Sequence, residues 1–163
     1  MGMWKFDKQS FTGHPEFSSD GLNVTSKRFD VESVVGTEDF ITGKHSWCFK
    51  INKFGRGLAV GVSLKGEHLH QLGWKTGNKW VWTSGGTKYS PQSLVAQSPL
   101  EWWEEGDVLK CQLDCDKQEL VIENFRTHKS DILTGFEDPV QPYFDLFLDV
   151  SIELIEVDGV PVK

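Results

Sequence analysis

Only one pair of histidines is spaced closely enough to suggest a metal site in this chain of 163 residues. His68 and His70 lie two positions apart beside Glu67, and no third histidine is nearby. A zinc site needs three or four ligands that cluster at set spacings. We therefore interpret these side chains as surface loop residues, and the sequence predicts no metal and no other cofactor.

The three cysteines, Cys48, Cys111 and Cys115, all fall in segments that we expect to be strands. Cys111 and Cys115 would lie on one side of the same strand, about 13 Å apart at the usual rise per residue. That separation is too long for a disulfide. Free cysteines are usually buried, so we predict three buried, reduced thiols and a cytosolic or nuclear compartment.

Catalytic patterns are also missing from the sequence. Paired carboxylates are available at Glu104, Glu105 and Asp107, but they sit in W-E-E-G-D, which reads as a turn before a strand. Gly85-Gly86 is flanked by predicted strands rather than by a helix N-terminus, so it does not resemble a phosphate loop. The sequence thus favours a protein that is not an enzyme. Hydrolysis by Glu104 and Asp107 across a groove remains the third alternative.

Aromatic residues are more abundant than a small core requires, with seven tryptophans and eleven phenylalanines. Six of the larger rings fall close together in or beside predicted loops: Trp74, Trp80, Trp82, Tyr89, Trp102 and Trp103. Such rings either fill the core or form a partner-binding rim. The formal net charge of −7 argues against nonspecific nucleic-acid binding, which needs a basic face.

The elements that position these residues are short strands. Residues 43–64 predict a hairpin in which Trp47, Phe49 and Ile51 share one face. Gly61 in its second strand should let another segment approach closely. About ten such strands, without a helical apolar period, predict one all-β domain over residues 1–163. Residues 1–16 should be a lead-in or edge strand, residues 126–141 should be a loop, and no run is long enough to cross a membrane.

Several segments taken together resemble the SPRY domain family over residues 17–157. The matching segments are F-S-S-D-G-L-N-V-T, F-I-T-G-K-H-S-W, L-A-V-G-V-S, L-G-W, K-W-V-W, E-G-D-V-L-K-C-Q-L-D, E-L-V-I-E-N-F and V-Q-P-Y-F-D-L. The resemblance implies a bent sandwich of two antiparallel sheets, of the concanavalin-like jelly-roll kind. It also implies no catalysis, and binding of peptides or proteins through loops at one end of the sandwich.

The resemblance also nominates binding residues. In members of the tripartite-motif (TRIM) type, a W-x-W strand lines the pocket, and here that is Trp80 and Trp82. Phe147 follows P-Y-F and can join them, while the loop that starts at Lys65 is a further contact region. The remaining candidates are the aromatic residues Trp74 and Tyr89 and, in the turn of residues 52–57, Phe54 and Arg56. The chain departs from the family pattern at three places. Two extra residues lie between the W-x-W segment and Lys88-Tyr89, and Cys48-Phe49 stands where an acidic residue usually follows the Trp of G-K-H-S-W. The N-terminal part also lacks an L-D-P-x-T-A signature.

The leading functional hypothesis is a non-catalytic protein-interaction module that binds a peptide or protein surface. Members of the family occur in TRIM ubiquitin ligases, SOCS-box proteins and ryanodine receptors, so a substrate-recognition part of a ligase or a signalling scaffold is expected. We expect a monomeric cytoplasmic or nuclear domain that binds neither nucleic acid nor membrane. The alternative is a glycan-binding, lectin-like sandwich, because aromatic platforms also stack on sugars.

Overall fold

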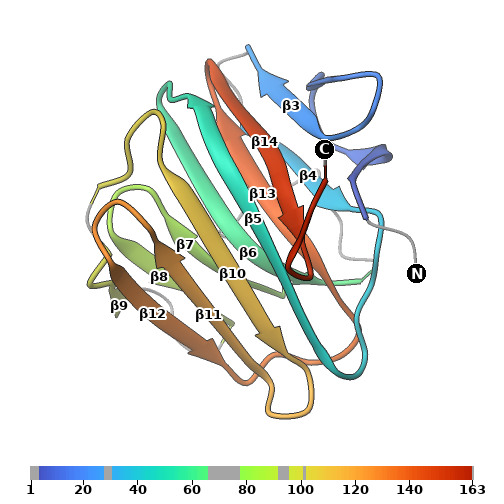
Figure 1. Cartoon of the computed structure of the whole chain (residues 1–163), viewed down its shortest axis with the longest axis vertical. Helices are drawn as coiled ribbons and strands as arrows, with labels where there is room; N and C mark the ends of the chain where they lie inside the picture. Colours follow the sequence, from blue (N-terminus) through green and yellow to red (C-terminus); the bar gives the residue numbers. More distant parts are fainter. Residues whose placement is uncertain (1–3, 28–30, 66–77, 92–95, 101, 163) are drawn as a thin grey trace.

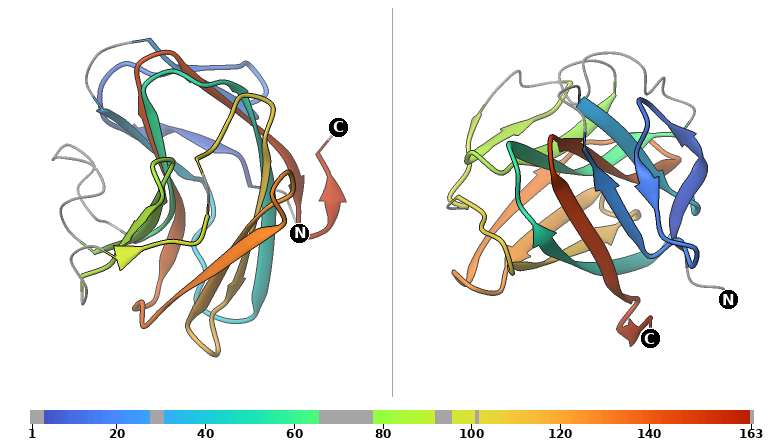
Figure 2. Two further views of the ribbon diagram at one scale, coloured as in Figure 1. Left: turned by 90° about the vertical axis from the view of Figure 1, so that its left-hand side faces the viewer. Right: turned by 90° about the horizontal axis from the view of Figure 1, so that it is seen from above.

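The computed structural model describes residues 4–27, 31–65, 78–91, 96–100 and 102–162. These residues form two antiparallel β-sheets packed face to face (Figures 1 and 2). They contain no helix, and therefore no helix that could span a membrane. The all-β sandwich expected from the strand pattern is confirmed.

The two sheets hold fifteen strands in all among the described residues. The first sheet has the order β1 (Phe6–Phe11), β4 (Val31–Gly36), β13 (Val140–Phe147), β6 (Gly57–Leu64), β7 (Lys79–Thr83), β8 (Thr87–Tyr89) and β9 (Ala96–Gln97). The second has the order β12 (Lys129–Thr134), β11 (Glu119–Asn124), β10 (Val108–Asp114), β5 (Lys44–Lys53), β14 (Val150–Val157), β3 (Asn23–Ser26) and β2 (Glu16–Phe17), with β15 (Val160–Pro161) paired to β14.

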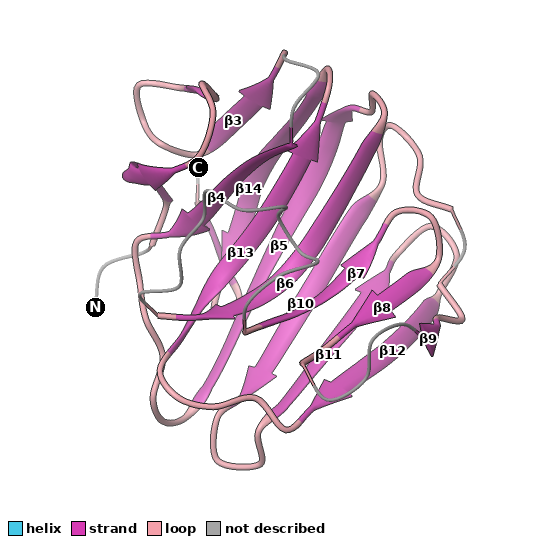
Figure 3. Cartoon of the chain, turned by 180° about the vertical axis from the view of Figure 1, so that it is seen from behind, coloured by secondary structure: helices cyan, strands magenta, loops and turns pink. Residues whose placement is uncertain are grey.

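The predicted hairpin of residues 43–64 is wrong in its pairing. Its two strands exist, but β5 pairs with β10 and β14, whereas β6 pairs with β13 and β7 in the other sheet. The turn between them therefore crosses from one sheet to the other (Figure 3). Trp47 and Phe49 of β5 and Val60 of β6 all belong to the core between the sheets. Two successive strands can bury their apolar faces either by pairing within one sheet or by facing each other from opposite sheets. Here β5 and β6 face each other from opposite sheets.

Gly61 makes the close approach that we expected. A Cβ atom at this position would lie only 1.9 Å from the carbonyl oxygen of Trp80 on the paired strand β7. Any side chain would therefore push β6 and β7 apart. This contact fixes the position of the W-x-W strand against the centre of the first sheet.

Two further segments, one expected to be a lead-in or edge strand and one expected to be a loop, both contain strands. The lead-in contains β1, an edge strand paired to β4, and Trp4 and Phe6 are buried in the core. Residues 126–141, expected to be a loop, contain strand β12. The strand was missed because its pattern is inverted, with polar Asp131 directed inward and apolar Ile132 40% exposed.

Candidate protein-binding surface

Trp80 and Trp82 do not form an exposed rim, which corrects the sequence-based prediction. Their relative exposures are 1% and 0%. Trp80 pairs with Val62 and Trp82 with Val60, so both indoles share the inward face of the first sheet with those valines. The Trp80 ring packs edge-on against Phe136, with centroids 6.1 Å apart. Both residues are core residues, and a partner cannot touch them without rearrangement of the strand.

Trp82 has a structural partner that the sequence did not reveal. Its indole N–H donates to Oδ2 of Asp131 at 3.0 Å, and Lys88 Nζ lies 3.0 Å from Oδ1. The Ser98 hydroxyl donates to the same carboxylate at 2.9 Å. Burial opposes ionisation of Asp131, but these donors outweigh it and hold its pKa below the ordinary value. Asp131 thus joins edge strand β12 of one sheet to β7 and β8 of the other.

The other nominated residues do not form one site. Lys65 lies at the opposite end of the sandwich from Phe147, where it pairs with Asp39 at 3.2 Å. Tyr89 is half-buried on the outward face of the first sheet, against Val81 and Tyr143. Trp74 falls outside the described residues, and so do Glu67, His68 and His70. Among the described residues, no cluster of three or more His, Cys, Asp or Glu side chains could hold a metal ion.

Phe54 and Arg56, in the turn between β5 and β6, lie beside the end of β13, where Phe147 pairs with Gly57. Figure 1 shows this turn at its upper left. The Arg56 amide donates to the carbonyl oxygens of Phe147 and Leu148 at 3.0 and 3.1 Å. Gly55 permits this contact, because a Cβ there would lie 1.6 Å from the Leu148 oxygen. The Arg56 side chain is exposed, and Phe54 is half-buried against the core.

The loop of residues 102–107 also lies at this end of the molecule and carries the most exposed aromatic ring of the described residues. Trp102 is 68% exposed, whereas the neighbouring Trp103 is 2% exposed and belongs to the core. The Trp102 ring lies above Gly85 in the β7–β8 turn, 3.4 Å from the position of a Cβ there. Glu105 accepts the Phe54 amide at 3.2 Å, which ties this loop to the β5–β6 turn. The sequence does not show which of the two adjacent tryptophans is buried, whereas the fold buries Trp103 and exposes Trp102.

A charge pair between buried Asp107 and exposed Arg126 holds the Trp102 loop in place. The Asp107 carboxylate, 1% exposed, lies 2.6 Å from Arg126 Nε. It also accepts from the Asn124 side chain and the Glu104 amide. Burial opposes ionisation of Asp107, but these hydrogen bonds outweigh it and hold its pKa below the ordinary value. Arg126 Nη2 donates in addition to the Trp102 carbonyl at 2.9 Å.

These contacts contradict the hydrolase alternative. A general acid or base must reach a substrate, whereas both oxygens of Asp107 already accept protein hydrogen bonds. Glu104 itself lies 3.4 Å from Arg126 Nε, with its side chain 64% exposed. The carboxylates of this loop therefore position the backbone. Phe125, which directly follows β11 and is 42% exposed, lies beside the start of β10. We call the region that these carboxylates support the loop-end surface; it comprises Phe54, Arg56, Trp102, Phe125, Arg126 and Phe147.

The three cysteines are free and buried, as predicted. Burial, with a smaller contribution from the Glu156 carboxylate, raises the pKa of the Cys48 thiol to about 12. Burial raises the pKa of Cys115 to about 11 and also raises that of Cys111. None of these thiols is poised to act as a nucleophile, because the reactive form is the thiolate.

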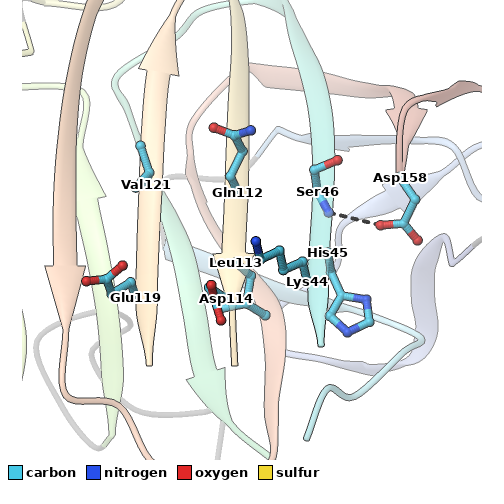
Figure 4. Close-up of a pocket in the computed structure, with 9 residues that line it drawn as sticks. All are labelled: Lys44, His45, Ser46, Gln112, Leu113, Asp114, Glu119, Val121 and Asp158. Carbon is cyan, nitrogen blue, oxygen red and sulfur yellow. Dashed lines mark hydrogen bonds between the residues drawn. The ribbon is translucent and has the colours of Figure 1, made fainter. Parts of the chain in front are cut away.

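A shallow hollow of about 580 Å³ lies on the outward face of the second sheet, at the other end of the molecule (Figure 4). It is lined by Lys44, His45, Ser46, Gln112, Leu113, Asp114, Glu119, Val121 and Asp158. Its lining mixes both signs of charge and contains no Trp, Tyr or Phe. Protein interfaces are anchored by Trp, Tyr and Arg, so the loop-end surface is the better candidate for partner binding.

Comparison with known proteins decides the family. A sequence model of the SPRY domain matches residues 44–152, more than half of the chain. The chain belongs to the SPRY domain family. Among solved structures, the SPRY domain of human HERC1 superimposes with a TM-score of 0.73 at 19% identity, covering 91% of this chain and 96% of that one.

Two further structures share this SPRY fold. The PSpry domain of TRIM65 has a TM-score of 0.76 at 16% identity, covering 94% of this chain and 92% of that one. Stonustoxin has a TM-score of 0.75 at 16% identity, and the match spans 93% of this chain but 26% of the toxin chain. At these identities the likeness shows the fold alone. A search of curated proteins finds no match.

Proposed function

We propose that this SPRY domain binds a peptide or protein partner through its loop-end surface. SPRY domains are protein-interaction modules that occur in ubiquitin ligases. The observation that carries the location is the 68% exposure of Trp102, the most exposed of the large hydrophobic side chains in the described residues. Exposing an indole forgoes a large hydrophobic gain, and a partner that covers the ring would recover it.

The support beneath Trp102 suits a binding anchor. Its backbone is held by Arg126, which is in turn fixed to the buried Asp107 carboxylate. A loop that is already ordered loses little conformational entropy on association. Tryptophan and arginine also dominate interface energetics, and here both lie on one surface with the half-buried Phe54 and Phe147.

The test compares two exposed apolar residues at opposite ends of the molecule. The tagged domain is used to isolate partners from cell extract, and each partner is then purified and its affinity measured by calorimetry. Trp102→Ala should weaken binding at least tenfold, as expected for an interface anchor. The matched control Ile41→Ala, which truncates a side chain that is 58% exposed, should leave the affinity unchanged. Equal affinities for both folded variants would place the site elsewhere.

We further propose that the domain works in the cytosol or nucleus, as the recognition part of a ubiquitin ligase or of a signalling scaffold. Three free thiols and no disulfide among the described cysteines support this compartment. Ubiquitination of a purified partner in an extract, lost with Trp102→Ala, would support the ligase role. Unchanged ubiquitination of the partner with the Trp102→Ala domain would contradict the ligase role.

Glycan binding is the second candidate, and the same residue favours it, because an exposed indole can also stack on a sugar ring. A glycan array probed with the wild-type domain, with and without calcium, separates the two functions. We expect no signal above background. A glycan whose signal disappears with Trp102→Ala would replace the protein-partner proposal.

A further inference from the structure

The chemistry around Trp102 indicates what kind of partner the loop-end surface accepts. We propose that the partner presents an arginine side chain that stacks on the Trp102 indole and pairs with the Glu105 carboxylate. This inference rests on the proposed function and adds the chemical class of the ligand. It is carried by three features of the described residues: an open aromatic ring, an oriented carboxylate, and the charge balance of the chain.

The first feature is the ring itself. Trp102 is 68% exposed, and its indole rests on the β7–β8 turn at Gly85, where no side chain competes for space. Tryptophan has the aromatic face that attracts cations most strongly. Arg126 supports this loop through its backbone, with its Nε and Nη2 atoms on Asp107 and its Nη2 also on the Trp102 carbonyl.

The second feature is the Glu105 carboxylate, which lies three residues after Trp102 in the sequence and is oriented by a hydrogen bond. Glu105 Oε1 accepts the Phe54 amide at 3.2 Å, and in the described part of the chain no partner is found for its Oε2. Glu104 adds a second side chain with 64% exposure. A guanidinium can satisfy both demands at once, because it stacks on aromatic faces and donates two parallel hydrogen bonds to a carboxylate. A lysine ammonium offers neither the plane nor the fork.

The third feature is charge. The chain carries 24 acidic and 17 basic residues, a formal net charge of −7, which attracts a basic segment over long range. Within the loop-end surface, Arg126 is paired with Asp107, whereas the exposed Arg56, whose amide donates to the β13–β14 turn, opposes this preference. Its removal should therefore strengthen binding of a basic partner and weaken binding of an acidic one.

The experiment selects ligands without assuming a partner. Short random peptides displayed on phage are selected on the wild-type domain, with counter-selection on Trp102→Ala. Selected peptides are synthesised, and their affinities for wild-type, Trp102→Ala, Glu105→Gln and Arg56→Gln domains are measured by calorimetry. Each peptide is also made with its arginine replaced by lysine and by citrulline, which keeps the shape and removes the charge.

We expect Trp102-dependent peptides enriched in arginine. Citrulline should weaken them about tenfold or more and lysine less, Glu105→Gln should weaken them about threefold, and Arg56→Gln should strengthen them. Trp102-dependent peptides that lack a basic residue, or acidic ones that need Arg56, would overturn this inference and leave the proposed function standing. A selection from which no peptide survives counter-selection on Trp102→Ala would contradict the proposed function as well.

Discussion

The Arg126 guanidinium binds the Asp107 carboxylate through two nitrogens, with Nε 2.6 Å from Oδ1 and Nη2 3.2 Å from Oδ2. Asp107 immediately precedes β10, and Arg126 lies just after β11, the strand that pairs with β10. The pair therefore closes one end of the second sheet and, through the Trp102 carbonyl, supports the exposed indole. Loss of this pair should therefore reduce both the stability of the domain and its affinity for a partner.

Removing Arg126 should destabilise the domain and weaken partner binding together. Arg126→Ala leaves the buried Asp107 carboxylate without its cation, which should cost about 2–3 kcal/mol of unfolding free energy because hydrogen bonds to charged groups are lost. Urea unfolding measures this loss. Arg56→Ala, which truncates an exposed arginine of the same surface, should stay within about 0.5 kcal/mol. An equally small effect for Arg126→Ala would show that the pair contributes nothing.

Acid should unfold the domain through Asp107, which is buried, and Asp131, whose side chain is 9% exposed. The pKa values of Asp107 and Asp131 lie below their ordinary value of 3.8 in the folded state. The unfolded chain therefore binds protons more readily, so this stability is complete above the unfolded value and is lost as pH falls from about 5 through the folded pKa. Asp107→Asn and Asp131→Asn should each flatten that slope in urea titrations. Glu38→Gln, at an exposed site outside both networks, should keep it.

The glycines of β6 should differ sharply in their tolerance of alanine. Gly61→Ala places a Cβ 1.9 Å from the Trp80 carbonyl oxygen, and should cost about 3 kcal/mol or abolish soluble expression. Gly57→Ala is the matched control on the same strand, where the nearest atom to the new Cβ is the Ser84 hydroxyl at 3.9 Å. Its melting temperature should be nearly unchanged. Comparable melting of both variants would mean that β6 and β7 can separate.

Trp82 and Trp102 should have opposite effects on stability and binding. Trp82→Phe removes the indole donor to buried Asp131 and leaves part of the core unfilled, at a cost of about 1–3 kcal/mol. Its affinity for selected peptides should be unchanged once the domain is folded. Trp102→Ala should alter stability by less than about 0.5 kcal/mol and lose binding. The reverse pattern would restore the W-x-W strand as the binding site.

The cysteines should be inert in the folded protein. Burial raises the pKa of Cys48 to about 12 and that of Cys115 to about 11, so little thiolate exists at neutral pH. A disulfide reagent should therefore modify the native domain slowly, and modify all three thiols rapidly in denaturant. Rapid reaction of a thiol in the native protein would show that the segment that carries this cysteine opens readily.

Much of the fold could be predicted from local pattern, because side-chain alternation reports which residues face a core. Trp47, Phe49 and Ile51 are buried as their spacing indicated, and Gly61 makes the predicted close approach. Pattern failed for β12, where Asp131 faces inward to meet Trp82. The reason is that a buried carboxylate becomes tolerable only when donors from other strands surround it, and those donors are distant in sequence.

The sequence by itself determined the all-β class, the SPRY resemblance and the burial of the cysteines. It could not tell whether β5 and β6 pair or face each other, because both arrangements bury the same apolar faces. It also could not divide the tryptophans between core and surface. The tertiary structure decided both, since Trp80 and Trp82 follow the inward register of Val62 and Val60. The Trp102 backbone, by contrast, is held by a charge pair between Asp107 of its own loop and Arg126, which follows β11.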